Sequence, residues 1–163
     1  MGNAWVDHLE HGSRFDIVEA FIRAWTDQDI DRCLAYMAPD ITYSDNIGDS
    51  LKPYKGVWQG KDELEPYMRT AANRWSILAM RPKHPRQRME DASLVQYQIE
   101  FVIRHRASGE VLFGGNRFVA RVEKGRIHEI QVFHDAAMFS AFLRLIGSQR
   151  HAKDSQKKSL VSC

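Results

Sequence analysis

The sequence predicts an α+β fold with N-terminal helices, a curved and mostly antiparallel sheet that wraps around them, and a C-terminal helix. Three observations lead to this prediction. Apolar residues recur with the 3.6-residue period of a helix up to about residue 75, with the two-residue period of a strand from about residue 95 to residue 134, and with the helical period again after residue 135. A sheet that curves strongly around helices leaves space where their side chains end, so we expect a cone with an internal cavity.

Amphipathic helices are predicted before the main sheet. The first covers residues 14–26 and the third covers residues 61–74. The second begins at Ile30 and ends before Pro39, because proline cannot continue a helix. The apolar positions of these helices are Val18, Phe21, Ile22 and Trp25; Ile30, Cys33, Leu34 and Met37; and Leu64, Tyr67, Met68, Ala71 and Trp75.

Extended segments alternate apolar and polar residues, as half-buried strands do. Residues 47–59 are rich in glycine, proline and polar residues and are predicted to form a long loop after the opening strand. Pro82 and Pro85 confine their segment to a sheet edge or a bulge. The predicted strands are 40–46, 77–90, 95–104, 111–123 and 126–134.

The final helix should be capped by Asp135, because aspartate accepts hydrogen bonds from the first backbone amides of a helix. Its predicted apolar face consists of Phe139, Phe142, Leu143 and Ile146.

The length of 163 residues predicts one domain, which would bury roughly 70% of its unfolded surface. We assign residues 1–13 to an N-terminal arm, residues 14–147 to the domain and residues 148–163 to a disordered basic tail. The net charge is only +2, so no global field favours nucleic acid as a partner.

Cys33 and Cys163 do not form a disulfide framework, and a reducing, cytoplasmic location fits them best. Residues 1–12 have no apolar core of a secretory signal. No stretch approaches the 18 apolar residues of a membrane span, so no membrane association is expected.

Asp45 stands out at the end of the opening strand. Side chains alternate along a strand, so Ile41, Tyr43 and Asp45 share the face that Ile41 marks as buried. Burial disfavours the charged form and would raise the pKa of this carboxyl group towards that of a general base. The alternative is that Asp45 caps the turn that follows through its own backbone.

Together, the segments AFIRAWTDQDIDRCLAYMAPDITYSDNIGD, YKGVWQGKDELEPYM and RFVARVEKGRIHEIQVFHD resemble the NTF2-like superfamily, in its SnoaL-like and ketosteroid-isomerase-like branch. The resemblance extends over about residues 14–140 by the order of elements. It implies a cone-shaped fold around an apolar cavity, and a homodimer. The stretch Y-S-D-N-I-G stands where ketosteroid isomerases carry V-E-D-P-x-G, so Asp45 occupies the position of the family's general base.

The sequence departs from two activities of this superfamily. Phe21 stands where the isomerases place an oxyanion-binding tyrosine, and their late-strand acid falls at or near Phe118, with Asn116 as the closest polar residue on the same face. Related epoxide hydrolases carry an acid at the position of Val132. Neither steroid isomerisation by the usual residues nor epoxide hydrolysis is therefore expected.

Related dehydratases use inward histidines and tyrosines, and this chain offers several. His105 shares the strand face of Tyr97, and His134 shares that of Val132. With Tyr43 and Asp45 they could form a polar cluster in an apolar cavity.

Each polar candidate also has a structural explanation. His134 could shuttle a proton or simply bond to backbone at a strand end, and His105, near a hairpin turn, is expected to be exposed. Tyr43 and Tyr97 could bind an oxyanion or only pack. Asn116 could donate a hydrogen bond or belong to a bulge.

Two further segments have candidate roles. Trp58, in the predicted loop, could act as a lid over the cavity. Residues 81–88, RPKHPRQR, could bind an anionic group, but charge and proline that protect an edge strand explain them better. No spacing of histidine, cysteine or acid resembles a metal site, and no phosphate-binding loop is present.

The sequence thus predicts a cofactor-independent acid–base enzyme that isomerises, cyclises or dehydrates a small apolar molecule with a carbonyl or hydroxyl group. Asp45 would transfer the proton, and His134, Tyr43 and Asn116 would bind the oxyanion. The alternatives are a non-catalytic module that binds a hydrophobic ligand and a dimeric module that pairs through the outer sheet face. The predicted substrate-binding residues are Asn116, Tyr97, Trp58, Phe21, Phe118, Val132 and His105.

Overall fold

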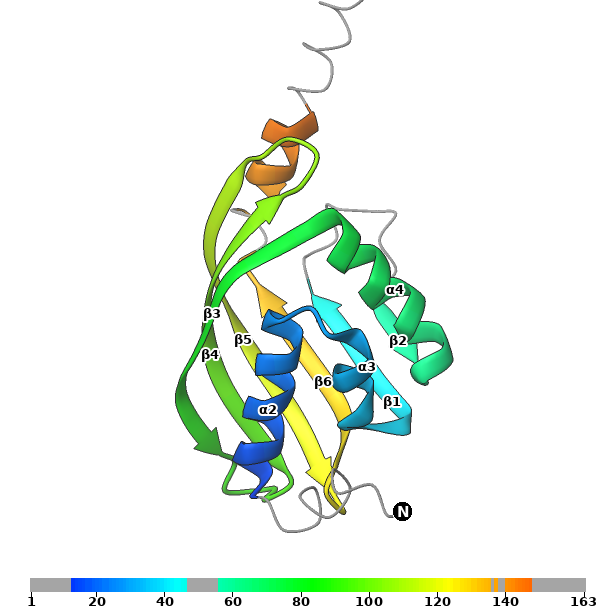
Figure 1. The fold of residues 1–163 in the computed structure, drawn as a ribbon. Coiled ribbons are helices and arrows are strands. Elements are labelled where there is room, and N and C mark those ends of the chain that lie inside the picture. The colour runs from blue at the N-terminus through cyan, green and yellow to red at the C-terminus, as the bar shows by residue number, and fades with distance from the viewer. Residues whose placement is uncertain (1–12, 47–55, 136, 138–139, 148–163) are drawn as a thin grey trace, which may run out of the picture.

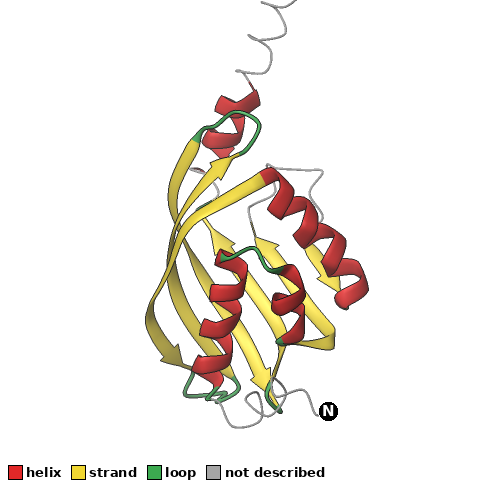
Figure 2. Cartoon of the chain, viewed as in Figure 1, coloured by secondary structure: helices red, strands yellow, loops and turns green. Residues whose placement is uncertain are grey.

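The computed structural model describes residues 13–46, 56–135, 137 and 140–147. It confirms the mixed α+β fold, with helices against a curved, unclosed sheet and a C-terminal helix (Figures 1 and 2). The predicted N-terminal arm, apart from Ser13, and the predicted basic tail lie outside the described residues. In chain order the elements are α2 (Arg14–Thr26), α3 (Ile30–Ala35), β1 (Met37–Asn46), β2 (Val57–Gln59), α4 (Lys61–Arg74), β3 (Trp75–Gln87), β4 (Leu94–His105), β5 (Val111–Glu123) and β6 (Arg126–His134), and residues 140–147 are helical.

The strands form one six-stranded sheet in the order β2-β1-β6-β5-β4-β3. β1 and β6 run parallel, and the other neighbours are antiparallel. The helices α2 and α3 lie against one face of this sheet, and α4 closes the side near β1 and β2 (Figure 1). β3 is an edge strand, as Pro82 and Pro85 require, because proline has no amide to donate to a second neighbour.

The helix α2 begins at a capping box and buries one face. The Asp16 amide donates to the Ser13 hydroxyl over 3.2 Å, and the Ser13 amide donates back to the Asp16 carboxylate over 3.0 Å. Its buried face packs into the main core, and each fully buried large apolar side chain contributes roughly 1.5–3 kcal/mol of burial free energy. That face consists of Ile17, Val18, Phe21, Ile22 and Ala24.

The largest change at the first strand is the boundary between α3 and β1, while β3 and β4 differ from the predicted strands 77–90 and 95–104 by one to three residues at their ends. α3 ends at Ala35, and β1 already begins at Met37, so Pro39 lies inside a strand and not after a helix. The β1–β6 register is irregular between Met37 and Thr42, which lets the strand accommodate the proline. Met37 is nevertheless buried, because the start of the strand packs into the same core that a longer helix would have reached.

The predicted loop over residues 47–59 contains a strand at its end. β2 pairs antiparallel with β1 and places Trp58 opposite Tyr43, while residues 47–55 lie outside the described part. Gly60 follows with a φ of +78°, a conformation that glycine adopts without strain, and its amide donates to the Ile41 carbonyl over 2.7 Å.

A second, smaller core lies where the C-terminal helix meets the sheet. Phe142 and Ile146 pack against Phe101 and Leu112, and Leu143 borders this cluster. The helix therefore covers the end of the sheet that α2 and α3 leave open, and a cavity lies between the two cores.

Candidate active site

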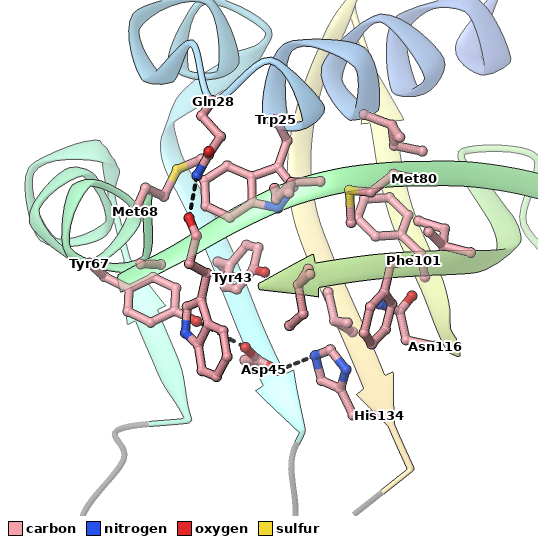
Figure 3. A pocket seen from close by; sticks show the side chains of 18 of the residues that line it. Trp25, Gln28, Tyr43, Asp45, Tyr67, Met68, Met80, Phe101, Asn116 and His134 are labelled. Carbon is pink, nitrogen blue, oxygen red and sulfur yellow. Dashed lines mark hydrogen bonds and ion pairs between the residues drawn. The ribbon is translucent and has the colours of Figure 1, made fainter. Parts of the chain in front are cut away.

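A cavity of about 230 Å³ lies between the helices and the sheet. Its walls come from α2, α4, β1, β3, β4, β5, β6 and the C-terminal helix, and Figure 3 shows the side chains that point into it. Most of these side chains are apolar or aromatic, as is usual for a site that binds a small molecule. Examples are Phe21, Ile22, Trp25, Met68, Met80 and Phe101.

One end of the cavity is polar, and Asp45 is at its centre. Tyr67 donates its hydroxyl proton to Asp45 Oδ2 over 2.9 Å, and His134 Nε2 lies 3.0 Å from Asp45 Oδ1 (Figure 3). The side chains of Asp45 and His134 are only 9% and 13% exposed. At this distance a protonated imidazole would form an ion pair with the carboxylate, and Asp45 Oδ1 has no hydrogen-bond partner among the residues that the structure describes.

The sheet register brings Asp45 and His134 together. Asp45 lies opposite Val132 in the parallel pairing of β1 with β6, so both side chains point to the same face. His134 follows Val132 by two residues and therefore shares that face. α4 packs against β1 and β2 and adds Tyr67 from the helix side.

Aromatic rings hold Tyr67 in place. Its ring stacks on Trp58 with centroids 3.8 Å apart and lies 6.0 Å from the ring of Tyr43. Burial, together with the negative charge of Asp45, raises the pKa of the Tyr43 hydroxyl well above its usual value. Tyr43 is therefore neutral at physiological pH and can act only as a protonated hydroxyl.

Asn116 adds a polar group whose bonding is incomplete. Its Oδ1 atom is buried and has no hydrogen-bond partner among the residues that the structure describes. Asn116 lies opposite His134 in the β5–β6 register, and the His134 ring meets Phe101 edge-on with centroids 6.0 Å apart. Because leaving a buried acceptor unsatisfied costs about 1–3 kcal/mol, this oxygen is suited to accept a hydrogen bond from a ligand, and the amide nitrogen of the same side chain is a donor.

The cavity walls contain seven of the ten residues that the sequence suggests for the site. They include Asp45, His134 and Tyr43, the three that the sequence assigns to catalysis. The seven residues are Phe21, Tyr43, Asp45, Asn116, Phe118, Val132 and His134.

Three predicted substrate-binding residues do not line the cavity, and their placement must be corrected. Tyr97 lies deep in the main core and donates to Glu19 Oε1 over 3.1 Å. Trp58 is not a loop residue that could act as a lid, because β2 pairing buries it behind Tyr67. From the sequence, His105 is expected to be exposed, but it is only 2% exposed. The centroid of its ring lies 5.0 Å from that of the Trp75 ring, and Ser108 Oγ lies 2.9 Å from its Nδ1 atom.

Sequence reasoning misses Tyr67, which it places among the apolar positions of the helix 61–74. A tyrosine on the apolar face of a helix carries one polar atom into the interior, where it usually finds a partner. That hydroxyl is the available signal, but its partner is 22 residues away on β1 and no local pattern indicates it.

Neither a metal cluster nor a membrane span is found in the described part of the chain. Within these residues, no three histidine, cysteine, aspartate or glutamate side chains are grouped so that they could hold a metal ion. No helix among them has the length and apolar character needed to cross a membrane.

One family model matches most of this chain. The model of the SnoaL-like domain matches residues 18–130, which is more than half of the chain. No curated protein gives a significant match.

Solved structures with a similar fold are distant in sequence. An NTF2-like protein of unknown function from Burkholderia pseudomallei is 23% identical, with a TM-score of 0.62 over 77% of this chain and 93% of that one. An LEH-like epoxide hydrolase from M. tuberculosis is 19% identical, with a TM-score of 0.65 over 85% of this chain and 96% of that one. TerC, co-crystallised with polyporic acid, is 16% identical, with a TM-score of 0.63 over 78% of this chain and 95% of that one. At these identities the likeness establishes the fold alone.

Proposed function

Because this chain belongs to the SnoaL-like family, we propose that it is a cofactor-independent enzyme that transfers a proton on a small, mostly apolar molecule held in the cavity. One observation carries this proposal. The Asp45 carboxylate lies 3.0 Å from an imidazole and 2.9 Å from a tyrosine hydroxyl, in the wall of an apolar cavity. A carboxylate in such a place can act as a general base, because few waters compete for its charge.

The two oxygens of the Asp45 carboxylate have different partners and would therefore have different roles. Tyr67 occupies Oδ2, so Oδ1 is the atom that would take a proton from substrate. In an isomerisation, the C–H bond beside a carbonyl breaks, the proton goes to Asp45 and the electron pair moves onto the carbonyl oxygen. His134, Tyr43 and the amide nitrogen of Asn116 would donate hydrogen bonds to that oxygen, and the proton would return to another carbon.

A dehydration would use the same groups differently. Asp45 would remove the proton from carbon, and His134 would protonate the departing hydroxyl, so that a C=C bond forms and water leaves. Epoxide hydrolysis is not proposed, because Val132 places an apolar side chain where related hydrolases carry an acid.

The cavity limits the size of the substrate. A cavity of about 150 Å³ takes up benzene, and this one measures about 230 Å³. We therefore expect a molecule with one or two rings, or an aliphatic chain of similar volume.

Solvent deuterium exchange tests the proposal with simple ketones in place of the natural substrate. We would incubate the protein in D₂O with 1-tetralone and 2-cyclohexen-1-one and follow deuterium incorporation beside the carbonyl by NMR. Wild-type protein should accelerate exchange, and Asp45→Asn should lower the rate by about 10²–10⁴-fold, the usual contribution of a general base. Asp40→Asn is the matched control, because Asp40 lies on the same strand but its side chain is 84% exposed.

Each alternative function gives a different result. A module that only binds hydrophobic ligands would bind these ketones without accelerating exchange, in the wild type and in both variants. An interaction module would do neither, and its outer sheet face would be buried in a complex. Equal acceleration by wild type and Asp45→Asn would remove Asp45 from the mechanism.

A further inference from the structure

We propose that the substrate carries an anionic group, such as a carboxylate, at the end opposite its reacting carbon, and that Arg74 binds this group at the cavity mouth. The inference rests on the proposed use of the cavity as a substrate site. It concerns which molecule binds, and it does not depend on which reaction follows.

The helix α4 connects the two ends of the cavity. Tyr67, Ala71 and Arg74 all line it, and their spacing of four and seven residues puts them on one face of the helix. At 1.5 Å per residue, the backbone positions of Tyr67 and Arg74 are about 10 Å apart along the helix axis. One rigid element therefore sets the distance between the group that holds Asp45 and the cation.

The charges of the cavity are separated between these ends. Asp45 is the only carboxylate among the described residues that line the cavity, and Arg74 is the only lysine or arginine among them. Asp45 is nearly buried, whereas Arg74 is exposed. An anionic substituent would be repelled by Asp45, but beside Arg74 it would meet opposite charge and keep part of its hydration.

The corner around Arg74 is held firmly. Its guanidinium lies over the Trp75 ring, 5.6 Å from the centroid, and Trp75 also lines the cavity. Gln28 donates to the Trp75 carbonyl over 2.7 Å and to the Ala72 carbonyl over 3.3 Å. Arg106 donates to Gln28 Oε1 over 3.0 Å, so three segments of the chain are tied together at this mouth.

The test compares two probes of equal shape that differ in charge, 6-phenylhexanoate and 6-phenylhexan-1-ol. Binding would be followed by the fluorescence of Trp25 and Trp75, which both line the cavity, and checked by calorimetry. Wild-type protein should bind the carboxylate about 5- to 10-fold more tightly than the alcohol, as for an ion pair of intermediate exposure. Higher salt should reduce this preference.

Variants assign the preference to one residue. Arg74→Gln should remove the preference for the carboxylate and leave the affinity for the alcohol unchanged, while Arg74→Lys should keep part of the preference. Arg69→Gln is the matched control on the same helix, because Arg69 contacts Glu65 and Asp31 and does not line the cavity. It should bind both probes as the wild type does, and thermal unfolding of each variant would confirm that it is folded.

The inference is overturned if wild-type protein binds both probes equally or fails to bind the carboxylate, or if Arg74→Gln keeps the preference. These results are independent of the proposed chemistry, because the measurement is of binding and needs no turnover. If Arg74 selects the carboxylate while Asp45→Asn leaves proton exchange unchanged, the proposed function fails and this inference stands.

Discussion

Replacing Tyr67 by phenylalanine tests the polar end of the cavity at a single hydrogen bond. The substitution removes the hydroxyl that donates to Asp45 Oδ2 over 2.9 Å and keeps the aromatic ring. The ring should remain stacked on Trp58 at 3.8 Å, so no large cavity is created. The measured loss should therefore report the hydrogen bond and little else.

The size of the loss follows from the charge and burial of the acceptor. A hydrogen bond to a charged group contributes about 1.5–3 kcal/mol, at the upper end when the acceptor is left without a donor in the interior. The side chain of Asp45 is only 9% exposed, but after the substitution His134 would still lie 3.0 Å from its Oδ1 atom and limit the loss. We expect Tyr67→Phe to lower the free energy of unfolding by about 1.5–2 kcal/mol, which corresponds to a decrease in Tm of about 3–8 °C for a chain of this size.

Denaturant titration at pH 7 would measure this change, and a double-mutant cycle would assign it. Asp45→Leu keeps the branching of aspartate without its acceptor oxygens, so Tyr67→Phe should cost almost nothing in that background. The coupling free energy between the two positions should be at least about 1 kcal/mol, with unchanged denaturant m-values. If Tyr67→Phe costs the same in both backgrounds, the hydroxyl does not stabilise Asp45 and the account of this site is wrong.

Two further predictions concern titratable groups outside the cavity. Hydrogen bonds from Ser93, followed by the interaction with Arg121, lower the pKa of Asp91 to about 2, so the stability it contributes is present above its ordinary pKa of 3.8 and is lost as the pH falls towards 2. Asp91→Asn should therefore lower the Tm at pH 6, and thermal scans should show the difference from wild type shrinking between pH 4 and pH 2; a constant difference would contradict this. Burial raises the pKa of the Cys33 thiol to about 12, so in a Cys163→Ser background iodoacetamide at pH 8 should label the unfolded protein but not the folded one. Equal labelling rates, followed by mass spectrometry, would show that Cys33 is accessible.

The parts of the fold that can be predicted correctly are those with a local signal. The helix 61–74 and the strands 111–123 and 126–134 match α4, β5 and β6, because their apolar residues repeat with an unambiguous period. β2 is missed because three residues carry no usable period and form a strand only by pairing with β1. The start of β1 is misplaced because Met37 fits the apolar pattern of a helix and that of a strand equally well.

In the candidate site, too, the features with a local sequence signal can be predicted and those that depend on long-range pairing cannot. Strand alternation is enough to place Asp45, Tyr43 and His134 on inward faces. Their proximity depends on the parallel register of β1 with β6, which pairs residues almost 90 positions apart. Neither segment contains a sequence pattern from which this pairing could be predicted. Tyr97 and His105 also point inward, but one reaches the closed end of the core and the other lies under Trp75, and alternation cannot distinguish depth along a strand.

The C-terminal helix has a consequence for how the cavity of this fold could diversify. Leu143 lines the cavity from this helix, and Phe142 and Ile146 fasten the helix to the end of the sheet. These side chains belong to the smaller core, whereas Asp45, His134 and Tyr67 are positioned by β1, β6 and α4. Exchanging residues 140–147 could therefore lengthen or shorten the cavity while Asp45, His134 and Tyr67 keep their positions, so that the size of the cavity and its polar end could be altered separately.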